Sequence, residues 1–225
     1  MRKSELARVI DYALVKPTNT LAEIEKACGV VLEHSIGVLC VLPPYVEHAA
    51  RRLAGSGSKV CAVVAFPFGA SPTEAKAKEA EICVEKGADE IDFVMNIPLF
   101  KSGDYDAVER DIAEVVSAAK RAGEKRGVDV IVKVIIETGY FTREEIAEAS
   151  KLVEEAGADF VKTCTGFGPR GATLEDVETI LKAVKRAKVK AAGGITTYAK
   201  ALEFVKAGAS RIGTSHALEI LTEAP

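Results

Sequence analysis

Apolar and polar positions alternate between two patterns from one end of the chain to the other. Short runs rich in β-branched residues, such as Val60–Ala65 and Val130–Ile136, are apolar nearly throughout, which is typical of parallel strands covered on both faces. A stretch of helical period follows each run. The expected strands are Val9–Ala13, Ile36–Leu42, Lys59–Ala65, Glu90–Met95, Asp129–Ile136, Phe160–Thr163, Lys188–Ala191 and Arg211–Gly213.

Several of the helical stretches begin with residues that cap the amino end of a helix. Thr73, Thr142 and Thr173 each precede acidic residues of an expected first turn. The expected helices are Thr20–His34, Pro44–Leu53, Thr73–Lys86, Asp104–Lys125, Thr142–Glu155, Thr173–Ala187, Thr197–Lys206 and Ser215–Leu221.

Eight strand–helix units without a linker or a change in composition predict one closed (β/α)8 barrel, the TIM barrel of the α/β class. We expect it to form a single domain over residues 1–225. An open, doubly wound sheet is the main alternative. It would be expected to carry a G-x-G-x-x-G motif after its first strand, and the sequence has none there.

A short internal repeat supports the barrel. Three expected helices end in a Gly-Ala step, at Gly87, Gly157 and Gly208, where glycine suits the left-handed conformation that ends a helix. The fifth residues after these glycines are Asp92, Lys162 and Gly213. These residues should therefore occupy equivalent places on their strands, and two of them are charged.

Charged side chains inside four expected strands are the most informative feature of the sequence. Asp92, Lys133, Lys162 and Lys190 each stand among apolar residues. Burying an unpaired charge costs several kcal/mol, so such residues need partners or a function. Structural ion pairs or charges at the barrel rim explain any one of them, but four charges converging from separate strands favour catalysis.

Two or three lysines beside one carboxylate indicate Schiff-base chemistry more than hydrolysis. A lysine attacks a carbonyl only as the neutral amine, and burial or a second cation lowers its pKa from the usual value of about 10.4. A carboxylate can relay the protons. His34 and His48 fall within expected helices and His216 begins one, so no strand end supplies a histidine for a metal centre.

Glycine-rich turns follow the last two expected strands, at Gly193-Gly194 and at Gly213-Thr214-Ser215. The loops after strands seven and eight of such barrels commonly bind phosphate through backbone N–H groups. A third loop, Thr165–Gly171, lies beside Lys162 and carries Arg170. That arginine either reaches an anion or is a solvated loop residue.

Composition narrows the partners and the location. A net charge of −3 without a long basic run argues against nucleic acid. No apolar stretch approaches the roughly 20 residues of a membrane span, and no signal-peptide pattern follows Met1, so we expect a cytoplasmic protein. Five cysteines without a C-x-x-C pair predict reduced, buried thiols. The lack of glutamine beside abundant charge favours a thermophilic source.

Taken together, these segments resemble the deoxyribose-phosphate aldolase family of class I (Schiff-base) aldolases over nearly the whole chain. The resemblance implies reversible cleavage of 2-deoxy-D-ribose 5-phosphate to acetaldehyde and D-glyceraldehyde 3-phosphate, in deoxyribonucleotide catabolism. It implies no metal or organic cofactor and a homo-oligomer, dimer or tetramer. The segments that carry it are Asp11–Pro17, Phe66–Gly69, Glu90–Asp92, Lys133–Thr138, Phe160–Phe167, Lys190–Ile195 and Ile212–Ser215.

The resemblance also implies a role for each matching residue. Lys162 would form the Schiff base, Lys190 would lower the pKa of Lys162 and transfer protons, and Asp92 would donate and accept protons through ordered water. The residues that would bind the substrate and its phosphate are Thr165, Gly166, Gly193, Gly194, Gly213 and Ser215. The residues that match the family's inner polar positions are Asp11, Cys40 and Lys133.

The sequence departs from the family pattern in places. Tyr12-Ala13 replaces a His-Thr pair, Cys164 replaces a common serine, and Gly168-Pro169-Arg170 replaces small polar residues. Some members end in a tail with a tyrosine that helps proton transfer, and no such tyrosine follows Leu221.

Two alternatives stay open. One is another Schiff-base sugar-phosphate lyase or a transaldolase-like barrel. The other is a barrel that binds a phosphorylated ligand without catalysis, against which a lysine pair beside a carboxylate argues.

Overall fold

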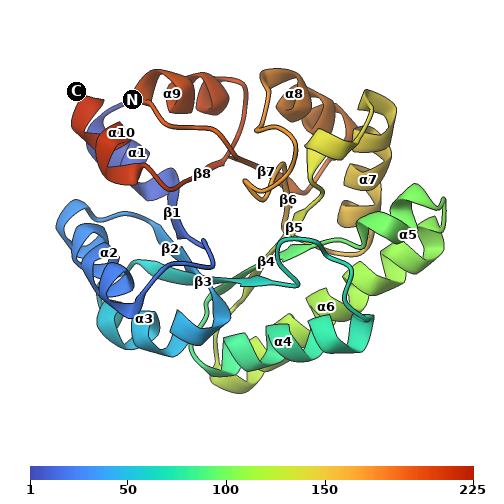
Figure 1. Ribbon diagram of the computed structural model, residues 1–225, viewed down its shortest axis with the longest axis horizontal. Helices are drawn as coiled ribbons and strands as arrows, with labels where there is room; N and C mark the ends of the chain where they lie inside the picture. The colour runs from blue at the N-terminus through green and yellow to red at the C-terminus, as the bar shows by residue number, and fades with distance from the viewer.

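The computed structural model describes residues 1–225, and its strands form one closed, all-parallel barrel (Figure 1). The strands follow one another around the barrel in chain order, and the last pairs with the first. The predicted (β/α)8 fold is confirmed. The strands are β1 (Ile10–Leu14), β2 (Val38–Val41), β3 (Lys59–Val64), β4 (Glu90–Val94), β5 (Ile131–Ile135), β6 (Phe160–Lys162), β7 (Lys188–Ala192) and β8 (Arg211–Thr214).

Helices surround the barrel on its outside (Figure 1). All eight predicted helices are present, and the short helices α1 and α5 and the 3-10 turns η1 and η2 were not predicted. The helices are α1 (Lys3–Val9), α2 (Leu21–His34), η1 (Pro43–Tyr45), α3 (Val46–Leu53), α4 (Thr73–Glu85), α5 (Ile97–Lys101), α6 (Tyr105–Arg126), η2 (Thr138–Tyr140), α7 (Arg143–Glu155), α8 (Leu174–Ala183), α9 (Tyr198–Lys206) and α10 (Ala217–Glu223).

Two of the three predicted threonine caps are confirmed. The hydroxyls of Thr142 and Thr173 each accept a hydrogen bond from the backbone N–H three residues on. The prediction for Thr73 is wrong, because this residue lies inside α4 and its hydroxyl donates to Asp111 Oδ1 at 2.8 Å. Asp111 is a buried residue of α6 and accepts hydrogen bonds from two residues of α4, Thr73 and Lys76 (2.8 Å).

Helix α8 ends at Ala183, four residues before the predicted end. The Glu154 carboxylate at the end of α7 accepts hydrogen bonds from the N–H groups of Lys185, Arg186 and Ala187. These donors are therefore held in a bend before β7 rather than in a further helical turn.

The glycine repeat places charged residues in register, as predicted. Gly87, Gly157 and Gly208 have φ of +115°, +84° and +106°, a region that favours glycine. The residues five positions on are each the third residue of their strands β4, β6 and β8. Alternate strands of such a barrel supply the side chains of one layer inside it. The residues in question are Asp92, Lys162 and Gly213.

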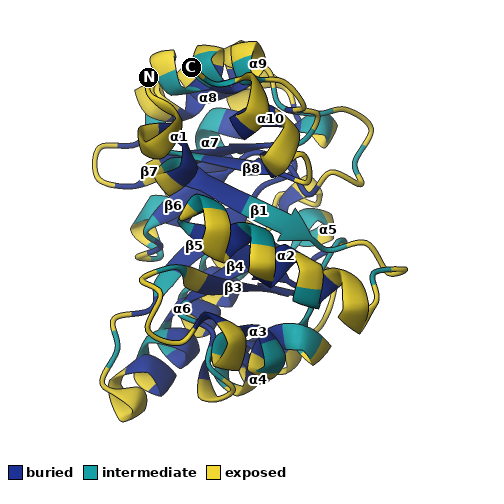
Figure 2. Ribbon diagram, turned by 90° about the vertical axis from the view of Figure 1, so that its left-hand side faces the viewer, coloured by how far each residue is buried: buried dark blue, intermediate teal, exposed yellow.

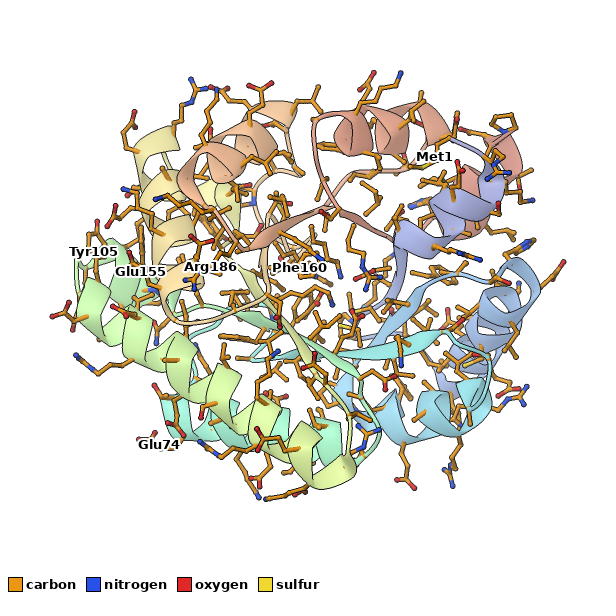
Figure 3. All side chains as sticks on the ribbon, turned by 180° about the vertical axis from the view of Figure 1, so that it is seen from behind. Met1, Glu74, Tyr105, Glu155, Phe160 and Arg186 are labelled. Atoms are coloured by element: carbon orange, nitrogen blue, oxygen red, sulfur yellow. The ribbon has the colours of Figure 1, made fainter.

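The strands are buried and the outer faces of the helices are exposed, as the dark blue centre and yellow rim of Figure 2 show. In Figure 3, seen from behind, Phe160 at the start of β6 lies in the central part of the molecule, whereas Glu74 and Tyr105 lie on outer helices. The two chain ends lie side by side, where the Lys3 N–H donates to the Pro225 carbonyl (3.2 Å). None of the helices has both the length and the apolar character needed to cross a membrane.

Candidate active site

Seven charged side chains meet inside the barrel, and they come from six of its strands. They include all of the charged residues that the sequence singled out. Glu90 and Arg211 were not predicted, although each stands two positions before a predicted site residue and so on the same face of its strand. The seven are Asp11 (β1), Glu90 and Asp92 (β4), Lys133 (β5), Lys162 (β6), Lys190 (β7) and Arg211 (β8).

Asp92 is the centre of this cluster. Its Oδ2 accepts hydrogen bonds from Lys162 Nζ and Lys190 Nζ, each at 2.7 Å. Its Oδ1 accepts from Lys133 Nζ at 2.9 Å and from the Cys61 thiol at 3.1 Å. Burial alone would raise the pKa of the Asp92 carboxyl, but the three lysines outweigh burial and hold that pKa well below its usual range. Asp92 is therefore a carboxylate in the resting protein.

Lys190 is held between two carboxylates. Its Nζ donates to Asp92 and to Asp11 Oδ2. Burial would lower the pKa of the Lys190 ammonium, but Asp11 and Asp92 outweigh it and raise that pKa far above the usual value. Lys190 therefore stays a cation beside Lys162, with which it is paired in strand register.

A lower layer of ion pairs supports the cluster from beneath. Lys133 Nζ lies 2.5 Å from Glu90 Oε2, and Arg211 contacts both Glu90 Oε1 (2.7 Å) and Asp11 Oδ1 (3.0 Å). Burial would lower the pKa of Lys133, yet Asp92 and the other acidic neighbours raise it well above its usual value. Lys133 is fully buried, so its role is to hold carboxylates in place.

A cavity of about 380 Å³ lies above the cluster at the carboxyl ends of the strands. Asp11, Asp92 and Lys133 lie beneath the lining, so they act through the residues above them. The predicted residues that line it are Cys40, Lys162, Thr165, Gly166, Lys190, Gly193, Gly194, Gly213 and Ser215. Residues that were not predicted also line it, among them Lys16, Thr18, Phe167, Thr214 and His216.

The glycine turns after β7 and β8 form one side of the cavity. Gly193 and Gly194 have φ of +99° and +73°, so the turn depends on glycine. A Cβ at Gly213 would stand 2.8 Å from Ala192 Cβ and 3.1 Å from Lys190 Cε. Glycine at this position therefore leaves room for the Lys190 side chain.

The departures from the family pattern lie mostly outside the cavity. Arg170 pairs with Asp176 at 2.6 and 2.9 Å and donates to the Thr138 carbonyl (3.1 Å), so it stabilises the end of its loop and does not line the cavity. Tyr12 is half-buried and packs against the core outside the lining, whereas Ala13 does line the cavity. Cys164 is buried, with its Sγ 3.3 Å from the Thr138 hydroxyl.

All five cysteines are buried and free of disulfides. The ligand atoms of Cys40, Cys61 and Asp92 lie within 4.8 Å of one another, a spacing that a metal ion requires. However, the Asp92 carboxylate already contacts three ammonium groups, which would repel a metal cation. These residues fit a hydrogen-bonded network better than a metal centre.

Comparisons with known proteins point to one family. The model of the DeoC/LacD family aldolases matches residues 4–222. The deoxyribose-phosphate aldolase of Thermococcus kodakarensis is 49% identical over 228 residues, covering 100% of this chain and 99% of its own. That of Thermoanaerobacter sp. is 48% identical over 219 residues, covering 97% and 96%.

Solved structures of aldolases are similar to this chain over most of its length. An aldolase named QR15 superposes with a TM-score of 0.90 at 40% identity, covering 97% of this chain and 95% of its own. A deoxyribose phosphate aldolase from Aeropyrum pernix, described as a unique tetramer, has a TM-score of 0.89 at 31% identity, covering 98% and 91%.

Proposed function

The chain belongs to the DeoC/LacD family of aldolases, and we propose that Lys162 is the amine through which it cleaves 2-deoxy-D-ribose 5-phosphate. The reversible products are acetaldehyde and D-glyceraldehyde 3-phosphate. The observation that carries the role of Lys162 is its place in the charge cluster.

The charges of the cluster do not balance while every lysine is protonated. Four cations face three carboxylates, which leaves one positive charge in excess inside the barrel. Lys133 and Lys190 each contact two or more carboxylates, whereas Lys162 contacts Asp92 alone and shares it with Lys190. Lys162 is therefore the lysine of the cluster with the fewest carboxylate contacts, and a neutral amine there makes the cluster neutral overall.

Lys162 also has access to a substrate. It lines the cavity, and 5% of the residue is exposed, in contrast to Lys133. The neutral amine attacks C1 of the open-chain sugar, and loss of water from the carbinolamine gives the imine. Asp92 Oδ2 is positioned to take the proton that Lys162 gives up, and the Lys190 ammonium to donate a proton to the departing hydroxyl.

Carbon–carbon cleavage then uses the imine as an electron sink. The C3 hydroxyl gives its proton to Asp92 through water, and the C2–C3 bond breaks. The electron pair of that bond forms the enamine, the protonated imine nitrogen becomes neutral, and D-glyceraldehyde 3-phosphate leaves. The enamine takes a proton at C2, and water hydrolyses the imine to release acetaldehyde and the free amine. Asp92 lies beneath the lining, and the Lys162 nitrogen is bound in the imine at this stage. Protons therefore pass between Asp92 and the substrate through Lys190 or water.

The glycine turns provide the proposed phosphate site. Gly193, Gly194, Gly213 and Ser215 line the cavity on the side of β7 and β8, next to Lys190. Backbone N–H groups can approach a phosphate closely at such glycines. Lys16, which also lines the cavity, adds a positive charge for the dianion.

Trapping of the imine tests the proposed function. Incubation with acetaldehyde followed by borohydride should leave one two-carbon adduct, on Lys162, which peptide mass spectrometry would locate. An adduct on another lysine, or none, would remove Lys162 from the mechanism.

Replacement of Lys190 by methionine should raise the pH needed for imine formation by about one unit or more. Without this cation, Lys162 no longer shares Asp92 and loses a neighbouring positive charge, and both effects hold the proton on Lys162. The rate of borohydride-trapped imine formation against pH measures the shift. Lys188→Met, at the exposed start of the same strand, is the control and should leave the profile in place. An unshifted profile in Lys190→Met would refute the role given to Lys190.

The proposal also covers the oligomeric state and the thermal stability of the protein. We expect a homo-oligomer, because helices cover the whole outside of the barrel and one relative is described as a tetramer. We also expect a heat-stable protein, with unfolding above the range of about 45–65 °C that is typical of mesophilic domains.

A further inference from the structure

Glu137 is a buried carboxylate beside the cavity that the mechanism above does not use. It is the second residue after β5, is 1% exposed, and has φ +57° and ψ +67°, a left-handed conformation that is uncommon outside glycine. Its Oε1 is buried without a hydrogen-bond partner. A Cβ at Gly168, in the loop after β6, would stand 2.6 Å from that oxygen, so the loop lies directly against Glu137.

The other oxygen of Glu137 binds Thr165 twice. Oε2 accepts a hydrogen bond from the Thr165 N–H at 3.0 Å and a short one from the Thr165 hydroxyl. Thr165 lines the catalytic cavity three residues after Lys162. The carboxylate thus links the end of β5 to the loop that follows the nucleophile's strand.

These bonds fix what the Thr165 hydroxyl can do. A hydroxyl has one hydrogen to donate and two lone pairs to accept with. The hydrogen points to Glu137, and one lone pair accepts from the Phe167 N–H at 3.0 Å. Only a lone pair remains for the cavity, so Thr165 can accept a hydrogen bond from a ligand but cannot donate one.

We propose that Glu137 is a positioning residue that makes Thr165 an obligate acceptor for a hydroxyl group of the sugar phosphate. This role rests on the proposed function. The aldehyde product carries one free hydroxyl beside its carbonyl. A lone pair binds the hydroxyl and repels the carbonyl oxygen, so Thr165 helps to set which way the aldehyde faces.

The surroundings show why Thr165 needs to be held. Thr165 and Phe167 also line a second, largely apolar cavity of about 370 Å³, together with Glu137 and residues of the loop after β3 and of α5. The Thr165 side chain therefore stands in a wall between two spaces. The short bond to Glu137 and the bond from the Phe167 N–H keep the hydroxyl in one orientation.

The test compares two acceptor aldehydes in the synthetic direction with acetaldehyde. D-glyceraldehyde 3-phosphate carries the hydroxyl, and 3-phosphooxypropanal is the same chain without it. The measured quantity is the ratio of their kcat/KM values. Glu137→Leu should lower this ratio by about tenfold, and Thr165→Val should lower it equally. Adding Thr165→Val to Glu137→Leu should lower it no further, because the residues act as one unit.

The controls separate positioning from simple loss of structure. Glu137→Gln keeps an acceptor oxygen and Thr165→Ser keeps the hydroxyl, so each should stay within about threefold of the wild-type ratio. Glu154→Leu removes a glutamate that likewise accepts hydrogen bonds from backbone N–H groups, but just before β7 begins, at the end of the barrel opposite the cavity, and should leave the ratio unchanged.

Each outcome decides the proposal. If kcat/KM of Glu137→Leu falls equally for both aldehydes, the role of Glu137 is only structural and the proposal is wrong. An unchanged ratio in Thr165→Val would also overturn the proposal, whether or not Glu137→Leu folds. Failure of the wild type to trap acetaldehyde on Lys162 would instead overturn the proposed function.

Discussion

Replacing Lys162 by methionine should lower kcat by about 10⁴-fold or more, the scale of effect seen when the nucleophile of a covalent catalyst is removed. Among the lysines of the charge cluster, only Lys162 both lines the cavity and lacks a carboxylate of its own, because Lys190 is bound by Asp11 as well as Asp92. Steady-state cleavage of 2-deoxy-D-ribose 5-phosphate measures the loss.

The same substitution should leave the protein folded. Methionine has a similar length, and removal of one of four cations leaves three opposite three carboxylates. Lys162→Arg is the matched control, since it keeps the charge but cannot form an imine, and it should be equally inactive. Turnover in Lys162→Met above about a hundredth of the wild-type rate would contradict the assignment.

Replacing Asp92 by asparagine should destabilise the protein by about 3–5 kcal/mol at neutral pH and also abolish most of the activity. The change leaves four buried cations opposite two carboxylates and turns an amide group towards ammonium groups that need an acceptor. Urea unfolding gives the free energy, and Asp129→Asn, an exposed residue, should change it by less than about 0.5 kcal/mol.

The loss of stability caused by Asp92→Asn should depend on pH, and it should be larger at neutral than at acidic pH. The pKa of Asp92 is lower in the folded than in the unfolded protein, so its contribution to stability is present above about pH 4 and is lost as the pH falls towards the folded pKa. Asparagine has no such contribution to lose. The difference in the free energy of unfolding between the wild type and Asp92→Asn should therefore become smaller below about pH 4. A gap that stays constant into acid would mean that the Asp92 charge does not stabilise the fold.

The sequence predicted the barrel because hydrophobic period and glycine stops are local signals. Lys162 and Asp92 could be placed together because each follows its glycine by the same number of residues. Short helices such as α1 and α5 were missed because they contain too few turns for a period to emerge.

Other site residues depend on contacts that no local pattern reveals. Glu90 and Arg211 begin their strands, where a charge normally faces solvent, and only closure of the barrel buries Glu90 between Lys133 and Arg211. Glu137 was noticed within a family segment but not as a site residue, because its importance depends on where the loop after β6 packs. His216 lines the cavity for the same kind of reason, although its sequence position indicated only a helix start.

The signs of the cluster are divided along the chain. All three carboxylates lie on β1 and β4, and all four cations lie on β5 to β8. Either half-barrel alone would keep cluster charges of a single sign without their partners, so we expect neither half to form this interior independently. Two fragments cut between β4 and β5 should instead prefer each other to a second copy of themselves. The ion pairs that surround Lys162 thus also determine how the two halves associate. They favour the complete barrel over separate fragments and over dimers of one fragment.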